Sequence, residues 1–202
     1  MYSFIFDIGG VLIRYNTQEV IDILSAKTKC APDKIERLFQ HDLLYQVETG
    51  RMACNAFYEN HILNAMPEIS YEDWIQAFME HYSVNPEGME LLQELKAKGH
   101  KVYILSNLAE FHKVAIERSL PEFFHHCEKN FYSYELGFHK PEKEIFEAVC
   151  SSIGEKPENC VFFDDMPANV EGANQAGMIG IRFSNECIDE IRERVAGILS
   201  NR

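Results

Sequence analysis

The stretch "FIFDIGGVL", residues 4–12, sets the interpretation of the whole chain. It begins with apolar residues, continues with one acid, Asp7, and two glycines, and ends with apolar residues again. This order is typical of a buried strand that ends in a tight loop. The stretch raises the question whether Asp7 is a nucleophile for phosphate chemistry, which would need a proton donor close by. The position two residues later, where a proton donor for the leaving group would be useful, is held by Gly9.

The composition favours one core and a small accessory module. The 202 residues are 46% hydrophobic and 12% aromatic, which is enough to bury such a core. A formal net charge of −13 opposes binding to nucleic acid or to an anionic membrane, because both need a basic patch. No apolar run approaches the roughly 18 residues of a membrane helix. We expect a cytoplasmic monomer or weak homodimer whose six cysteines are free thiols.

Hydrophobic periodicity predicts alternating strands and helices. The expected strands cover residues 2–6, 100–105, 130–133, 160–163 and 178–183. Short apolar runs of this kind suit a parallel sheet that is covered on both faces. Asn85 is predicted to cap the helix that follows it, and Ser70 with Asp73 forms a predicted capping box. We expect an α/β chain with a Rossmann-like parallel sheet in three αβα layers.

Residues 15–84 interrupt this alternation, because they contain helical patterns and no convincing strand. About four helices inserted after the first strand would form a second, all-helical module. The predicted organisation is one α/β domain made of residues 1–14 and 85–202, with a helical domain at residues 15–84. Short hinges are expected near Tyr15 and at residues 83–86.

Polar side chains follow the expected strands at the points where ligands bind to an open parallel sheet. They are Asp7, Ser106, Asn107, Lys140, Asp164 and Asp165. A carboxylate nucleophile can form an aspartyl-phosphate, while a hydroxyl, an amide and a lysine oppose the charge of the phosphoryl group. Carboxylates from two segments can share a hard cation such as Mg²⁺. The set predicts phosphoryl transfer on a small phosphorylated substrate.

Four motifs resemble those of the haloacid dehalogenase (HAD) superfamily: "FDIGGVL" (6–12), "ILSN" (104–107), "GFHKP" (137–141) with the following "EIF", and "VFFDDMPANVEGANQAG" (161–177). The helical insert then corresponds to the C1-type cap of that superfamily. Within the insert, "ETGRMACNAF" (48–57) is similar to a pattern of a bacterial subgroup that includes an α-D-glucose-1-phosphate phosphatase. The resemblance implies a phosphatase, with sugar phosphates as the favoured substrates.

The resemblance also implies a role for each matching residue. Asp7 would be the nucleophile and a magnesium ligand, and the backbone carbonyl of Gly9 would bind the same ion. Ser106 and Lys140 would bind the phosphoryl oxygens, and Asn107 would contact the substrate. Asp165 is the favoured acidic metal ligand of the last motif. Asp164 would bind the metal directly or through water, with Asn169 in support.

Gly9 departs from the usual pattern, because most phosphatases of the superfamily carry a second Asp at this position. A general acid of this kind contributes roughly 10²–10⁴ in rate. The favoured interpretation is a phosphatase that takes its proton from the cap, from water or from the substrate itself, with Glu48, Arg51 and His41 as candidates by location. The alternatives are a 2-haloacid dehalogenase, whose leaving halide needs no proton, and a catalytically impaired member that binds a phosphorylated ligand or a protein partner.

Overall fold

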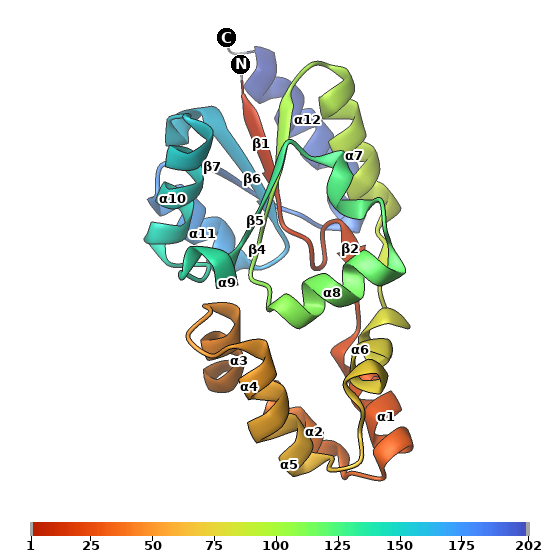
Figure 1. Ribbon diagram of the computed structural model, residues 1–202. Coiled ribbons are helices and arrows are strands. Elements are labelled where there is room, and N and C mark those ends of the chain that lie inside the picture. The colour runs from red at the N-terminus through yellow and green to blue at the C-terminus, as the bar shows by residue number, and fades with distance from the viewer. Residues whose placement is uncertain (1, 201–202) are drawn as a thin grey trace.

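The computed structural model describes residues 2–200, and a five-stranded parallel sheet forms its centre (Figure 1). The strand order is β5 (Lys129–Tyr132), β4 (Lys101–Ser106), β1 (Ser3–Phe6), β6 (Cys160–Asp164) and β7 (Ile179–Arg182). Each strand begins and ends within one residue of its predicted stretch. The predicted α/β fold class is therefore confirmed.

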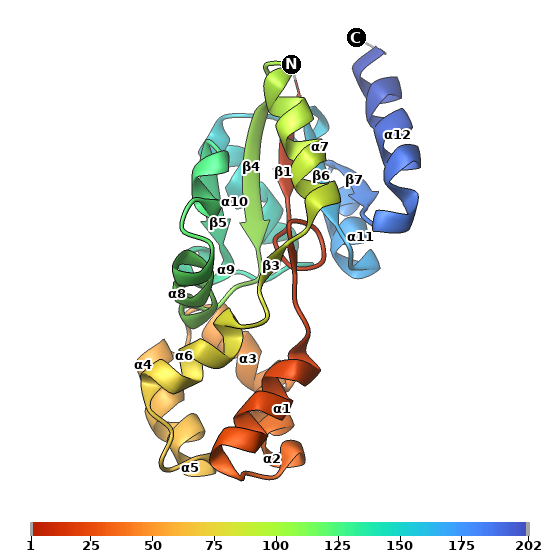
Figure 2. The ribbon, with the colours of Figure 1, turned by 90° about the vertical axis from the view of Figure 1, so that its right-hand side faces the viewer.

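Helices cover both faces of the sheet (Figure 2). They are α7 (Pro86–Ala97) and α12 (Ile188–Ser200) on one face, and α10 (Lys143–Ile153) and α11 (Pro167–Gln175) on the other. The alternation of side chains along β6 explains this arrangement. Phe163 belongs to the same apolar cluster as Leu92 of α7 and Ile191 of α12, whereas Phe162 packs against Phe146 of α10. These contacts build three layers.

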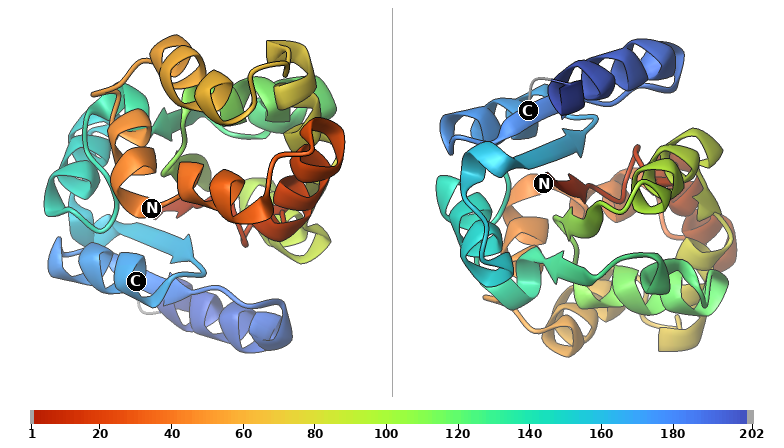
Figure 3. Two further views of the ribbon diagram at one scale, coloured as in Figure 1. Left: turned by 90° about the horizontal axis from the view of Figure 1, so that it is seen from below. Right: turned by 90° about the horizontal axis from the view of Figure 1, so that it is seen from above.

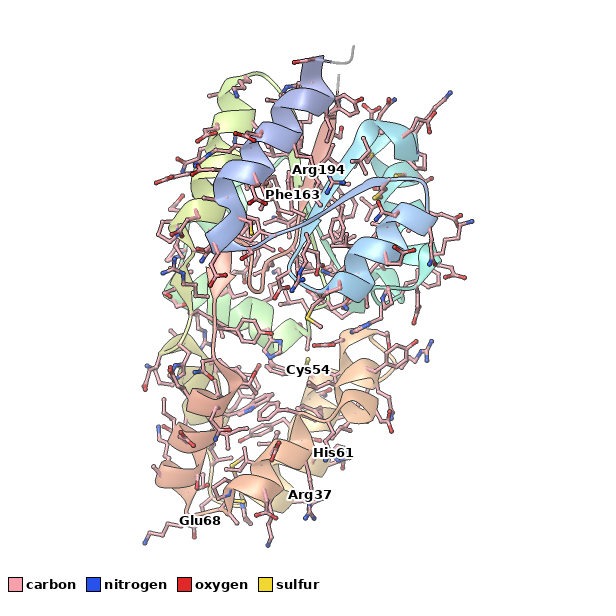
Figure 4. All side chains as sticks on the ribbon, turned by 180° about the vertical axis from the view of Figure 1, so that it is seen from behind. Arg37, Cys54, His61, Glu68, Phe163 and Arg194 are labelled. Atoms are coloured by element: carbon pink, nitrogen blue, oxygen red, sulfur yellow. The ribbon has the colours of Figure 1, made fainter. Side chains whose placement is uncertain are left out.

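A helical bundle lies beyond the carboxyl ends of the strands (Figures 1 and 3). It consists of α1 (Thr17–Thr28), α2 (Pro32–Leu38), α3 (His41–Glu48), α4 (Cys54–Phe57), a π turn (Tyr58–Ile62), α5 (Leu63–Ala65) and α6 (Tyr71–Met79). Ser70 caps α6 as predicted, since its hydroxyl oxygen accepts the N–H of Asp73 at 3.0 Å. In Figure 4, His61 and Glu68 mark the bundle, while Phe163 marks the distant sheet.

The apolar core of the bundle includes part of α8 (Glu110–Ser119), the helix that follows β4. The ring of Trp74 lies 4.6 Å, between centroids, from the ring of Phe111 on α8, and Phe78 lies 5.2 Å from the same ring. Trp74 and Phe111 are fully buried. This aromatic packing holds the bundle against α8, the helix that follows β4 of the sheet.

The two chain segments that join the bundle to the sheet form a short antiparallel ribbon, β2 (Ile13–Arg14) with β3 (Ser83–Val84). The sequence predicted hinges here but no strands, because two-residue strands carry no periodic signal. Asn85 is the N-cap residue of α7, as predicted, but its side chain makes no capping hydrogen bond to that helix. Its Nδ2 donates instead to the carbonyl of Val11 at 2.8 Å and to Asn185 at 2.9 Å.

The remaining elements are short: a 3₁₀ turn (Phe123–His126), α9 (Ser133–Leu136), and 3₁₀ turns at Pro157–Asn159 and Asn185–Cys187. The six cysteines are free thiols, as predicted. No helix within residues 2–200 combines the length and the apolar character needed to cross a membrane.

Candidate active site

Asp7 follows β1 directly, at the edge of the sheet that faces the bundle (Figure 1). Its backbone N–H donates to the carbonyl of Phe163 at 2.9 Å, and its side-chain Oδ1 accepts the N–H of Ile8 at 2.7 Å. Gly10 has a φ of +71°, and a Cβ at this position would overlap the carboxylate of Asp165. Glycine at this turn is what allows the loop to bring the two acids together.

Lys140 is the buried cation of the site. Its Nζ lies 2.9 Å from Oδ1 of Asp7 and 2.6 Å from Oδ2 of Asp164, and it donates to the carbonyl of Leu105 at 3.3 Å. Burial alone would lower the pKa of Lys140, but the two carboxylates together raise it above its ordinary value. The ammonium therefore stays charged and fixes the two carboxylates relative to each other.

Three carboxylates meet at this edge of the sheet. Oxygens of Asp7, Asp164 and Asp165 lie within 4.8 Å of one another. Burial raises the pKa of Asp7 to about 7, although the charge of Lys140 opposes this shift. Burial also raises the pKa of Asp165, and the adjacent Asp164 adds to the effect. One ammonium against three carboxylates leaves excess negative charge, and this set of oxygen donors fits a hard divalent cation.

The two acids of the last motif have different surroundings. Asp164 is fully buried and accepts hydrogen bonds from Lys140, from the N–H of Met166 at 2.9 Å and from Nδ2 of Asn169 at 3.0 and 3.1 Å. Asp165 instead lines the cavity that also contains Asp7. Asn169 thus supports Asp164, whereas the carboxylate of Asp165 is among the groups that face the cavity.

Ser106 and Asn107 follow one another at the end of β4, yet they differ in their contacts. Ser106 is buried, and its hydroxyl is among the groups that lower the pKa of Asp7. Oδ1 of Asn107 accepts the N–H of Lys140 at 2.8 Å, and its Nδ2 donates to the carbonyl of Lys140 at 3.0 Å. Asn107 therefore positions the lysine, a role that the sequence did not reveal. Its contact with the substrate stays a prediction.

A side chain of the bundle also reaches the site. Glu48 ends α3, and its Oε2 lies 2.8 Å from Nε2 of His139. Nδ1 of His139 lies 2.7 Å from the carbonyl of Lys140. His139 was missed, because in the sequence it is a single loop histidine and its partner is 91 positions away. The contact links the bundle to the loop that presents Lys140.

The other two candidate proton sources are Arg51 and His41. The guanidinium of Arg51 lies 4.9 Å from the centre of the Tyr45 ring, outside the described lining of the cavity with Asp7. The hydroxyl of Tyr45 donates to Glu142 at 2.6 Å. The side chain of His41 lies outside the described part of the structure. Of the three candidates, Glu48 is the one seen to line the cavity.

The space in front of Gly9 is occupied by Tyr15. A Cβ at position 9 would lie 2.8 Å from Cε1 of Tyr15, which is closer than an ordinary contact. Tyr15 follows β2 and lines the same cavity as Asp7. A carboxylate at position 9 would compete with this ring for space. No periodic or motif signal in the sequence indicated that Tyr15 would be brought back to the loop.

The cavity has a volume of about 310 Å³ and lies between the sheet edge and the bundle. The predicted residues that line it are Asp7, Gly9, Glu48, Ser106, Asn107, Lys140, Asp165 and Asn169. Val20 of α1 and Phe78 of α6 line it from the side of the bundle. A molecule bound at Asp7 would therefore contact both parts of the fold.

Known proteins share this fold and these motifs. Residues 3–177 match the model of the haloacid dehalogenase-like hydrolase family. A HAD family enzyme of Bacteroides thetaiotaomicron, solved with magnesium and inorganic phosphate, superposes with a TM-score of 0.78 at 27% identity. The match covers 91% of this chain and 94% of that one.

Two curated relatives match nearly full length. A D-ribitol-5-phosphate phosphatase of Bacteroides thetaiotaomicron is 24% identical over 184 residues, which are 87% of this chain and 88% of the relative. The sesquiterpene phosphatase astK of Aspergillus oryzae is 26% identical over 186 residues, 90% of this chain and 89% of the relative. Because the family model matches residues 3–177, most of the length of this chain, the chain belongs to the haloacid dehalogenase-like hydrolases.

Proposed function

We propose that this hydrolase is a magnesium-dependent phosphatase that cleaves a small phosphomonoester through an aspartyl-phosphate on Asp7. The observation that carries the proposal is the contact of Lys140 with both Asp7 and Asp164 at the carboxyl edge of the sheet. The names of the matched relatives support a phosphatase. In this proposal the bundle, residues 15–84, is a cap domain over a core of residues 1–14 and 85–202.

The metal ion would be Mg²⁺, since its preferred ligands are oxygens. Asp7, Asp165 and the backbone carbonyl of Gly9 would hold it, with Asp164 close behind. When bound, Mg²⁺ supplies positive charge that offsets the repulsion between a carboxylate nucleophile and a phosphate. The magnesium in the Bacteroides structure supports the choice of metal.

The reaction has two displacement steps at phosphorus. First, a carboxylate oxygen of Asp7 bonds to phosphorus, and the ester oxygen leaves with the electron pair of its bond and takes up a proton. Then a water oxygen attacks the same phosphorus, the Asp7 carboxylate is released and the water gives up a proton. Ser106 and Lys140 oppose the negative charge of the phosphoryl oxygens in both steps.

The source of the leaving-group proton is open to experiment, because Gly9 has no side chain to supply it. Glu48 and Tyr15 both line the cavity and both carry a group that can donate a proton. A phosphatase with a weak or distant acid favours esters whose leaving group needs little protonation. We expect p-nitrophenyl phosphate to be hydrolysed much faster than an alkyl phosphate.

The test is release of phosphate from p-nitrophenyl phosphate. The native protein should be active with Mg²⁺ and inactive with a chelator, and Asp7→Asn should abolish turnover. Asp22→Asn, an exposed acid on α1, is the matched control and should retain activity. Activity that survives Asp7→Asn would refute the nucleophile assignment.

Gly9 is also compatible with a second reaction, dehalogenation, because a leaving halide needs no proton. Chloride release from 2-chloropropionate without a metal ion would favour a dehalogenase over the phosphatase. No activity in either assay, together with a rise in melting temperature on adding a phosphorylated ligand, would instead favour a binding protein. The excess of carboxylates over cations at the site favours the metal-dependent phosphatase.

A further inference from the structure

Part of the cavity beside Asp7 is lined by apolar side chains of the bundle and of the α8 region. Six side chains form this part of the wall: Val20, Phe39, Leu44, Phe78, Leu108 and Ile116. The first four come from the bundle, whereas Leu108 and Ile116 come from α8 and the loop before it. Val20, Phe78, Leu108 and Ile116 are buried and belong to the apolar cores of the molecule. We call this part of the cavity the apolar wall.

Charged groups beside the apolar wall are already engaged or neutral. Glu48 lies 2.8 Å from His139, and Lys140 is held by Asp7 and Asp164. Burial lowers the pKa of His112, which also lines the cavity, to about 4, so its ring is neutral near pH 7. The described lining contains no arginine and no lysine besides Lys140. A second anionic group on a ligand would be buried there without a cation, which is costly.

Several hydrogen-bonding groups that line the cavity are already engaged, because Glu48 is paired with His139 and Asn107 with the backbone of Lys140. The remaining groups are the hydroxyls of Tyr15, Thr17 and Tyr82 and a ring nitrogen of His112. A sugar or polyol phosphate carries several hydroxyls, and each one that enters an apolar environment without a partner loses affinity. A hydrocarbon chain in the same place gains affinity from burial of its surface. The lining therefore favours an apolar alcohol over the sugar predicted from the sequence.

We propose that the substrate is the phosphate monoester of an apolar alcohol, with the phosphate at Asp7 and the alcohol against the apolar wall. This inference rests on the proposed phosphatase function and specifies its substrate class. A cavity of about 310 Å³ holds about ten groups of the size of a water molecule. The phosphate takes about half of this room, which leaves space for an alkyl or prenyl chain of about five carbon atoms.

Alkyl phosphates test the proposal on the native enzyme with Mg²⁺. From methyl to pentyl phosphate, kcat/KM should rise by about fourfold for each methylene that is buried. Pentyl phosphate should also exceed ribitol 5-phosphate by about tenfold or more, because the two have the same carbon number and differ in the hydroxyls. A flat series, or a preference for ribitol 5-phosphate, would overturn the proposal.

Val20→Thr provides a second test, since it replaces a wall methyl by a hydroxyl with little change in shape. It should reduce the preference for pentyl over ribitol 5-phosphate by about fivefold or more. Val195→Thr is the matched control, because Val195 is equally buried on α12 and is absent from the described lining. It should leave the preference unchanged. An equal change in both variants would contradict a role for the wall.

Failure of this inference is distinguishable from failure of the proposed function. Hydrolysis of p-nitrophenyl phosphate that depends on Mg²⁺ and on Asp7, combined with a flat alkyl series, would reject the apolar substrate and retain the phosphatase. No hydrolysis of any ester, p-nitrophenyl phosphate included, would reject the phosphatase and the substrate class with it.

Discussion

Replacement of Lys140 by methionine removes the buried cation and keeps most of its volume. Nζ of Lys140 lies 2.6 Å from Asp164 and 2.9 Å from Asp7, and Asp164 is fully buried. Removal of one partner from a buried ion pair costs about 3–5 kcal/mol, because the remaining charge is left uncompensated. For a chain of this length, 1 kcal/mol corresponds to about 2–4 °C in Tm. We therefore expect Tm to fall by about 6–20 °C in the presence of a chelator.

The loss of stability in Lys140→Met should depend on pH. The folded-state pKa of Asp7 is about 7, above its ordinary value of 3.8, so the folded chain binds this proton more tightly than the unfolded chain. Stability from this group is present at low pH and is lost as the pH rises through 7. Without Lys140, which lowers the pKa of Asp7, the pKa rises further. The difference between Lys140→Met and the native chain should therefore be smaller at pH 5 than at pH 8, while the loss of the Asp164 contact remains at both pH values.

Thermal unfolding followed by circular dichroism at both pH values, with a chelator, measures this difference. Lys113→Met is the matched control, because Lys113 forms a partly exposed pair with Glu117 one helical turn away, worth about 0.3–0.5 kcal/mol. Added Mg²⁺ should restore part of the stability lost in Lys140→Met. A loss no larger than that of Lys113→Met, or one that is the same at pH 5 and pH 8, would refute the electrostatic account.

Two further substitutions test contacts around the site. Gly9→Asp should lower the free energy of unfolding by about 1 kcal/mol, since its Cβ would lie 2.8 Å from the ring of Tyr15, an exposed side chain that would have to shift. Tyr15→Ala in the same chain should recover most of this loss, whereas strictly additive effects in urea unfolding would contradict the steric explanation. Glu48→Gln should cost about 1.5–3 kcal/mol, because it weakens the mostly buried contact with His139. Glu19→Gln, at a more exposed glutamate–histidine pair, should cost less than about 1 kcal/mol, and equal losses would argue against a special role for Glu48.

The sequence predicted the parts of this structure that depend on local patterns. Strands such as Ser3–Phe6 were predictable because an apolar run has to be covered on both faces. Asp7 and Lys140 were predicted together because parallel strands bring their carboxyl ends to one edge. The contacts that were missed cross long distances in sequence. Asn107 reaches the backbone of Lys140, and Glu48 reaches His139, and no local pattern specifies either pairing.

Three asparagines show how a site with excess negative charge is held in place by neutral groups. Asn85 donates to the carbonyl of Val11 in the loop that follows Asp7, Asn107 binds the backbone of Lys140, and Asn169 donates to both oxygens of Asp164. An aspartate in any of these positions could not donate these bonds and would add to the repulsion among the carboxylates. A lysine or arginine would compete with a metal ion for the carboxylates. An amide side chain holds its partners in place without adding charge, so the negative charge of the site is left to be balanced by a metal ion.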